Sequence, residues 1–284
     1  MTTAEKSELI IAVPAGPQIP GDPRHSEGSR LAEPTHRLLQ EAGLRYSLVG
    51  RQLTGAVSGT NWRIVEFRGS DIPKAVAEGD ADIGFTTSDK ALNLPDDEFD
   101  EEGEFRRIEI MRELGYGGCE YRAGYTERLG ASEDTKLEIA EGHTVGVGLY
   151  HLARRIFQER GIKPVDYVVR DGHVENTTIP PRGRALLILD IYETGITMRA
   201  NDLKPAKEQL MLFQAIEIRR KGSLGRNAEE MMARFDSRIA MALENREAWM
   251  RSQDKRFPQA NLDFRVPQIP GIRQLTFPNT LVAA

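Results

Sequence analysis

The sequence contains little cysteine, no long apolar run and no excess of positive charge. Its single cysteine, Cys119, excludes an intrachain disulfide and a cysteine-rich metal site. No apolar run is long enough to cross a bilayer, and the first residues, MTTAEKSELIIAVPAG, lack the basic segment and apolar core of a secretion signal. The formal net charge of −5 leaves no basic excess for sequence-independent binding of nucleic acid. We therefore expect a cytoplasmic protein with neither a membrane nor a nucleic-acid partner.

The composition that remains is that of an ordinary globular protein, with 39% apolar and 29% charged residues. A chain of 284 residues is long enough for two compact lobes, each with its own core, or for one large domain with an appendage. No internal repeat is visible in the sequence. Function must therefore be sought in local motifs.

The stretch from Leu186 to Asn201, LLILDIYETGITMRAN, carries the clearest chemical signal. Its apolar opening, which ends at Asp190, predicts a buried strand of a parallel sheet. The turn that follows contains Gly195 between two threonines, and glycine adopts backbone angles closed to other residues. Amide groups that converge after a buried strand bind anions, phosphate above all. The same pattern also fits an ordinary strand followed by a polar turn.

Residues 190–201 resemble the phosphoribosyl-diphosphate loop of the ATP phosphoribosyltransferase family, which catalyses the first step of histidine biosynthesis. The similarity extends upstream through Gly183 and Ala185 to Glu175, with two additional residues between Glu175 and Gly183. The resemblance implies a phosphoribosyl-diphosphate site formed by Asp190, Glu193, Thr194, Gly195, Ile196 and Thr197.

A second block, from Arg68 to Asp89, is similar to the R-x-x-D-I-P-x-x-V-x-x-G-x-A-D-x-G segment of the same family. The resemblance implies nucleotide contacts at Arg30, Arg51, Asp71, Thr86 and Glu175, with Asp190 and Arg30 as catalytic residues. It also implies Mg²⁺ as cofactor, with metal ligands unassigned. An arginine at a helix start is also common as a solvated side chain, and Asp71 also fits a plain helix N-cap.

Three departures from the family pattern fall on the nucleotide and pyrophosphate side. Gly28 and Ser29 replace a Lys-Gly pair after an insertion at residues 17–27, Gly148 and Leu149 stand where the family has Lys or Ser before Tyr-Pro, and Leu186 replaces an acid. The resemblance thus implies phosphoribosyl transfer to N1 of ATP, with transfer to another heteroaromatic base as one alternative. A non-catalytic small-molecule binding protein of the same shape is the other.

The resemblance further implies an α/β fold of two lobes, like a type II periplasmic binding protein, with ligands held between the lobes. We expect lobe I to comprise residues 1–106 and 198–222, and lobe II residues 107–197. Within lobe I, residues 210–218 are expected to form one returning strand. Residues 223–284 are expected to add an amphipathic helix, whose apolar stripe is core or subunit interface, and an extended arm in place of a histidine-sensing domain. A homo-oligomer is expected, and feedback by histidine would require a separate regulatory subunit.

Overall fold

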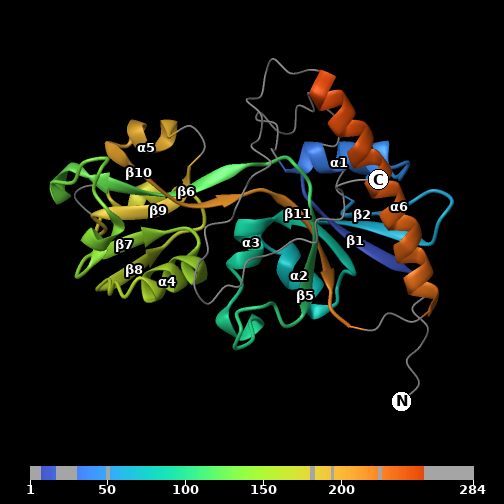
Figure 1. Cartoon of the computed structure of the whole chain (residues 1–284), viewed down its shortest axis with the longest axis horizontal. Coiled ribbons are helices and arrows are strands. Elements are labelled where there is room, and N and C mark those ends of the chain that lie inside the picture. The colour runs from blue at the N-terminus through green and yellow to red at the C-terminus, as the bar shows by residue number, and fades with distance from the viewer. Residues whose placement is uncertain are drawn as a thin grey trace. The chain divides into compact units, whose positions relative to one another are not determined.

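The structure, a computed structural model, describes residues 8–16, 31–48, 52–179, 183–192, 195–222 and 226–252 (Figure 1). Two compact units divide the chain, and each contains its own sheet. Unit 1 lies within Met1–Ser88, Phe105–Gly117 and Ala215–Asp263. The described part of unit 2 lies within Asp89–Glu104 and Gly118–Gln214.

Unit 1 is built on a six-stranded sheet with the order β2-β3-β1-β4-β11-β5. The strands are β1 (Leu9–Pro14), β2 (Thr54–Ala56), β3 (Trp62–Phe67), β4 (Ile83–Thr87), β5 (Ile108–Glu113) and β11 (Ala215–Arg220). The central strand β1 runs parallel to β3 and β4, and β11 runs antiparallel to β4 and β5. The segments ELIIAV at residues 8–13 and WRIVEFR at residues 62–68 have apolar and alternating patterns typical of strands, and β1 and β3 form there.

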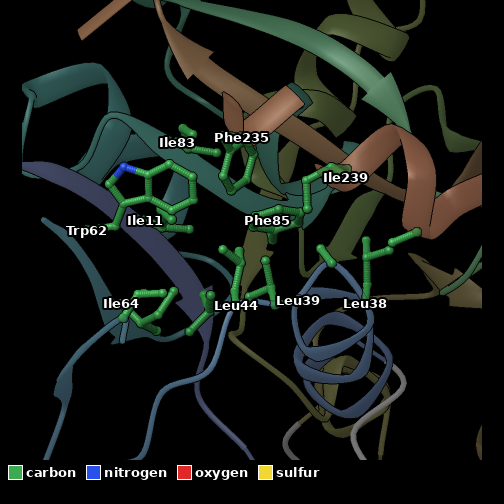
Figure 2. Close-up of a cluster of buried hydrophobic side chains, with 14 of the residues drawn as sticks. Ile11, Leu38, Leu39, Leu44, Trp62, Ile64, Ile83, Phe85, Phe235 and Ile239 are labelled. Carbon is green, nitrogen blue, oxygen red and sulfur yellow. The ribbon is translucent and has the colours of Figure 1, made fainter. Parts of the chain in front are cut away.

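Helices cover both faces of this sheet. On one face, α1 (Ala32–Glu41) and the long helix α6 (Arg226–Ser252) enclose the main apolar core, which Figure 2 shows in close-up. On the other face lies α2 (Ile72–Glu78), whose Ile72 and Val76 press so closely on Gly84 that a side chain there would collide with them. The sheet is therefore buried on both sides, as its apolar strands predict.

The apolar stripe of α6 belongs to the core of unit 1. Phe235 packs edge-to-face on Trp62, with ring centroids 5.8 Å apart, and also contacts Phe85 on β4. Ile239 continues the same contact one turn later (Figure 2). Of the two expectations for this stripe, core is confirmed.

Unit 2 is built on a five-stranded sheet with the order β10-β6-β9-β7-β8. The strands are β6 (Cys119–Thr126), β7 (Thr144–Val147), β8 (Asp166–Val169), β9 (Leu187–Tyr192) and β10 (Leu203–Phe213). The pairs β7–β8 and β7–β9 are parallel, whereas β6 runs antiparallel to β9 and β10. The apolar run that precedes Asp190 thus forms an interior strand of the sheet, as predicted.

The two faces of this sheet carry different elements. Helix α4 (Tyr150–Glu159) lies on one face, where Tyr150 and Phe157 contact Tyr167 of β8. The 3₁₀ turn η4 (Val174–Thr177) and the short helix α5 (Ile196–Ala200) lie on the other, against Gly146 and Gly124 respectively. The remaining short elements are α3 (Ser88–Leu92), η1 (Asp96–Glu98), η2 (Glu127–Leu129) and η3 (Leu137–Ala140).

The boundaries of the units differ from the expected lobes in three places. Residues 89–104, expected in lobe I, belong to unit 2. The chain re-enters unit 2 after Gly117 and not at residue 107, because β5 pairs with β11 in the sheet of unit 1. The single strand expected at residues 210–218 is two strands in different sheets, β10 in unit 2 and β11 in unit 1, which are separated by Gln214. The segments on either side of Gln214, LMLF and AIEI, are both largely apolar, so the sequence pattern does not reveal this change of sheet. In the part of the chain that the structure describes, no helix is long and apolar enough to cross a membrane.

Candidate active site

The candidate site in unit 2 is centred on Asp190, near the carboxyl end of β9. The three preceding residues, Leu187 to Leu189, are buried between β6 and β7 and fix the strand in register. One carboxylate oxygen, Oδ1, accepts a hydrogen bond of 2.8 Å from the backbone N–H of Ile191. The sheet therefore holds both the backbone and the carboxylate of Asp190.

Gly148, one of the departures from the family pattern, lies directly beside this carboxylate. A Cβ atom at residue 148 would be 3.3 Å from Oδ1 of Asp190 and 3.2 Å from the Val174 side chain. Glycine thus lets the end of β7 pass close to the acid, and it supplies no side chain of its own. A lysine here would place a flexible cation against Asp190, and this chain has none at that position.

The environment raises the pKa of Asp190 from 3.8 to about 6. Burial is the largest cause, because it disfavours the charged form. The hydrogen bond from Ile191 acts in the opposite direction, the charges of Glu175 and Asp89 raise the pKa further, and that of Lys90 lowers it. Glu175, in η4, is itself buried, and it lies close enough for its charge to act on Asp190.

The phosphate loop is described from Gly195 onward; Glu193 and Thr194 lie outside the described residues. Gly195 has φ of +67° and caps the start of α5, which confirms the left-handed conformation expected for this glycine. Other side chains of the protein pack closely against Gly195 at the place where a side chain of its own would project. A Cβ atom there would collide with the ring of Tyr192 and lie 2.7 Å from Nη1 of Arg199.

The other predicted loop residues, Ile196 and Thr197, are exposed in the first turn of α5. The turn is held from beneath by Met198, which is buried against Gly124 and Ile188. The Asn201 side chain donates a hydrogen bond of 2.8 Å to the carbonyl of Thr197. The loop is therefore anchored on the sheet side and open on the other.

Two arginines surround Tyr192, next to the loop. The guanidinium of Arg122 stacks on the Tyr192 ring at 4.8 Å from its centroid, and Arg199 donates to the hydroxyl at 3.4 Å. Arg122 also donates to the carbonyl of Ala206 and forms an ion pair with Glu120, so its position is fixed. Two cationic side chains therefore lie against Tyr192, a feature that the motif alone did not reveal.

The predicted nucleotide contacts in unit 1 are only partly described, because Arg30 and Arg51 lie outside the described residues. Asp71 occupies the N-cap position of α2 but its side chain makes no capping hydrogen bond, and it is exposed. Thr86, by contrast, is fully buried, and its hydroxyl donates to the carbonyl of Gly69 at 3.1 Å. The Asp71 carboxylate accepts a hydrogen bond of 3.3 Å from the Ser70 hydroxyl and is accessible to a ligand, whereas Thr86 holds the turn that precedes α2.

Sequence reasoning assigned no role to Asp89 and Lys90, which the structure brings close to Asp190. Both begin the short helix α3, and Asp89 ends the second family-like block, so its position in the motif was the available signal. Among the described residues, no group of three or more histidine, cysteine or acidic side chains is arranged to hold a metal ion.

Two α/β units, each with its own sheet, define a periplasmic-binding-protein-like fold, and one of them carries an acid near the end of an interior strand before a glycine-capped turn. Solved structures support this class. The ATP phosphoribosyl transferase (HisG:HisZ) complex from Thermotoga maritima matches with a TM-score of 0.62 at 18% identity, over 84% of this chain and 99% of that one. A histidine kinase sensor domain with similarity to periplasmic binding proteins matches with a TM-score of 0.52 at 13% identity, over 88% and 96% of the two chains.

Sequence comparison identifies the family. The family model of ATP phosphoribosyltransferase matches residues 68–240, more than half of the chain, so the chain belongs to this family. The ATP phosphoribosyltransferase of Methanocaldococcus jannaschii is 30% identical over 183 residues, which cover 63% of this chain and 58% of that protein. The chain thus matches less than two thirds of the length of this relative.

Proposed function

We propose that the protein transfers the phosphoribosyl group of phosphoribosyl diphosphate to N1 of ATP in the cytoplasm, the first step of histidine biosynthesis. In this displacement the new bond forms between N1 and C1′, and the bond from C1′ to the pyrophosphate oxygen breaks with its electron pair. The observation that carries the proposal is the arrangement of Asp190 and the Gly195 turn on β9 and α5, within the matched family region.

Asp190 would accept hydrogen bonds from the ribose hydroxyls. Its carboxylate is held by the Ile191 amide and lies at the end of a rigid strand, which favours a fixed sugar orientation. Positive charge grows on the ribose in the transition state, and a nearby carboxylate stabilises that charge. Glu175, which is buried next to Asp190, adds to the same negative environment.

The turn that begins at Gly195 would bind the 5-phosphate. Thr194 and Thr197 offer hydroxyls, the turn offers amides, and Arg199 lies over Gly195. Asp71, Arg30 and Arg51 would contact the nucleotide or the pyrophosphate. Proximity and electrostatics supply the catalysis, since the displacement needs no nucleophile from the protein.

Mg²⁺ fits this chain only as an ion carried by the substrate. No described group of three ligands exists, and magnesium is commonly held by one or two carboxylates together with substrate phosphates. Asp190 is the residue that would contact such an ion. When bound, the ion would neutralise charge on the departing pyrophosphate.

Gly148 favours a second candidate acceptor. Position 148, beside the Asp190 carboxylate, carries no lysine, which lowers the positive charge available to a triphosphate. A smaller or less charged heteroaromatic base would then replace ATP, with the same phosphoribosyl donor. Phosphoribosyl transfer is common to both candidates.

Steady-state release of pyrophosphate from phosphoribosyl diphosphate, with magnesium present, tests the proposal with ATP and a panel of bases in parallel. Turnover with ATP above the no-enzyme control supports the first candidate, and turnover with a base alone supports the second. Tight binding of phosphoribosyl diphosphate without release for any acceptor would favour a non-catalytic binding protein. Asp190→Asn is the inactive control.

Regulation would require a further partner. The solved Thermotoga maritima protein is described as a HisG:HisZ complex, and we propose that a second subunit of comparable role binds this chain, which itself forms a homo-oligomer. Co-expression followed by measurement of the molar mass in solution tests both parts.

A further inference from the structure

Asp89 is a buried carboxylate without hydrogen-bond donors among the described residues. It is 1% exposed, and neither of its oxygens accepts a hydrogen bond from any residue that the structure describes. Its contact is an ion pair of 3.4 Å between Oδ2 and the ammonium of Lys90. Because buried carboxylates are normally hydrogen-bonded, Asp89 in this state costs the folded protein stability.

Asp82 provides the contrast within the same chain. It is also buried, at 2% exposure, but its Oδ2 accepts a hydrogen bond of 2.9 Å from the backbone N–H of Ile10. That bond ties β1 to the residue preceding β4, which is an ordinary structural role. Asp89 has no comparable bond, so a structural role does not account for its burial.

The surroundings of Asp89 connect it to the Asp190 site. The segment after α3 is anchored on α4: the Asn93 side chain accepts the N–H of Leu152 at 3.2 Å, and Arg155 donates to the carbonyl of Leu94 at 3.2 Å. Helix α4 begins two residues after Gly148, where an added Cβ atom would lie 3.3 Å from Oδ1 of Asp190. Asp89 and Asp190 therefore both lie near the first turn of α4.

The electrostatics agree with this placement. The buried hydroxyl of Tyr121 has a pKa raised well above 10, chiefly by burial and then by the charges of Asp190 and Asp89. Glu175 and Asp89 raise the pKa of Asp190, and Lys90 lowers it. The charges of Glu175 and Asp89 thus both act on Asp190, and Lys90 is the described cation whose charge acts on it.

We propose that Lys90 binds the pyrophosphate end of a phosphoribosyl diphosphate held at Asp190, and that Asp89 is the positioning residue that fixes the Lys90 ammonium for this contact. The proposal rests on the proposed function. The Lys90 side chain is 28% exposed, so its ammonium is accessible to a ligand while Asp89 remains behind it. A diphosphate next to three carboxylates requires such a cation, and Gly148 supplies none.

Calorimetric titration tests Lys90, with inorganic pyrophosphate and with phosphoribosyl diphosphate as probes and Mg²⁺ in the buffer. Lys90→Gln should weaken the affinity for both probes by roughly 10- to 100-fold, the loss typical of a charge-assisted hydrogen bond, and Lys90→Arg should restore most of it. Lys74→Gln, on α2 with its side chain 68% exposed, is the matched control and should bind as the wild type does. Circular dichroism confirms that each variant is folded.

Thermal unfolding, measured without and with phosphoribosyl diphosphate, tests the role of Asp89. Asp89→Asn should raise Tm by about 2–4 °C, because it removes a buried charge without hydrogen bonds, and should reduce the Tm increase that phosphoribosyl diphosphate produces. Asp82→Asn should lower Tm, because it weakens a satisfied bond. A fall in Tm for Asp89→Asn as well would assign Asp89 a structural role and overturn its part in the proposal.

The remaining outcomes separate this inference from the proposed function. If the wild type binds phosphoribosyl diphosphate and Lys90→Gln binds it equally well, the Lys90 contact is wrong and the proposed function stands. If the wild type binds neither probe, the proposed function fails and the inference fails with it.

Discussion

At the scale of single residues, Asp190 lies in the candidate site, and burial of its carboxylate lowers the stability of the folded protein. Its pKa is 3.8 in the unfolded chain and about 6 in the folded protein, chiefly because it is buried. The folded state therefore holds the proton over a pH range in which the unfolded state has released it. The penalty is absent below about pH 4, grows between pH 4 and 6, and is complete above pH 6, where it reaches roughly 3 kcal/mol.

Asp190→Asn should consequently stabilise the ligand-free protein at pH 8 by up to about 3 kcal/mol and leave its stability at pH 4 nearly unchanged. Urea unfolding at the two pH values measures this difference. The same variant should lose phosphoribosyl diphosphate affinity at pH 8, since an amide accepts fewer hydrogen bonds from ribose hydroxyls than a carboxylate. Equal destabilisation at both pH values would contradict the account of Asp190.

Gly195 is required for two reasons at once, its positive φ and the packing of Tyr192 and Arg199 over it. Gly195→Val should weaken phosphoribosyl diphosphate binding at least about tenfold, because a branched side chain displaces both neighbours from the loop. Gly161→Val is the matched control, since Gly161 has φ of +68° and nothing within 4 Å of a Cβ. It should lower stability by about 1–2 kcal/mol through backbone strain and leave affinity unchanged. Unchanged affinity in folded Gly195→Val would remove this loop from the site.

At the scale of elements, the sequence pattern predicted those strands and helices that bury consecutive residues or one continuous face. The apolar run before Asp190 forms β9, and the residues around Gly195 form the expected turn. Pattern failed at Gln214, where one apolar run passes from β10 to β11 and changes sheets. It also failed to reveal that the Thr86 hydroxyl is committed to Gly69, or that Asp89 lies near Asp190, because such contacts depend on how distant segments pack.

The attachment of α6 to its sheet adds a buried ionic network to the apolar contacts. Glu217 on β11 is fully buried and forms ion pairs with Arg219, at 2.6 Å, and Arg112, at 3.0 Å; both arginines also pair with Asp236 on α6. Burial raises the pKa of Glu217, while the two arginines act to lower it. The network thus stabilises α6 only as a complete set, since removal of one charge leaves the others buried and unbalanced.

Glu217→Gln should therefore destabilise the protein by about 3–5 kcal/mol, which chemical denaturation would measure. Glu78→Gln is the control: Glu78 pairs with Lys74 at 3.8 Å on the exposed surface of α2, and its loss should cost less than about 1 kcal/mol. Similar costs for the two variants would mean that the network contributes no more than a surface pair. Since α6 packs in the core of unit 1, loss of the Trp62 fluorescence signal should accompany the change.

At the scale of the whole molecule, the chain forms two units with separate sheets, and the predicted ligand contacts fall in both. Asp190, Glu175 and the Gly195 turn belong to unit 2, and Asp71 belongs to unit 1. The family-model match at residues 68–240 spans parts of both units. Under the proposed function, the phosphoribosyl donor would bind in unit 2, and the acceptor would meet Asp71 in unit 1.

Hydrogen exchange followed by mass spectrometry should resolve these assignments. A ligand that binds only the native state slows exchange of the amides whose opening it opposes, by about 2.7 kcal/mol at a concentration of 100 times Kd. Phosphoribosyl diphosphate should protect peptides that cover 145–150, 174–178 and 187–200, all in unit 2. Addition of ATP should extend protection to the turn before α2 around Asp71. Because α6 packs through Phe235 and Ile239 into the apolar core of unit 1, peptides from 229–245 should exchange equally under all conditions and serve as the internal control. Protection by phosphoribosyl diphosphate confined to unit 1 would contradict the placement of the donor at Asp190, whatever acceptor the protein uses.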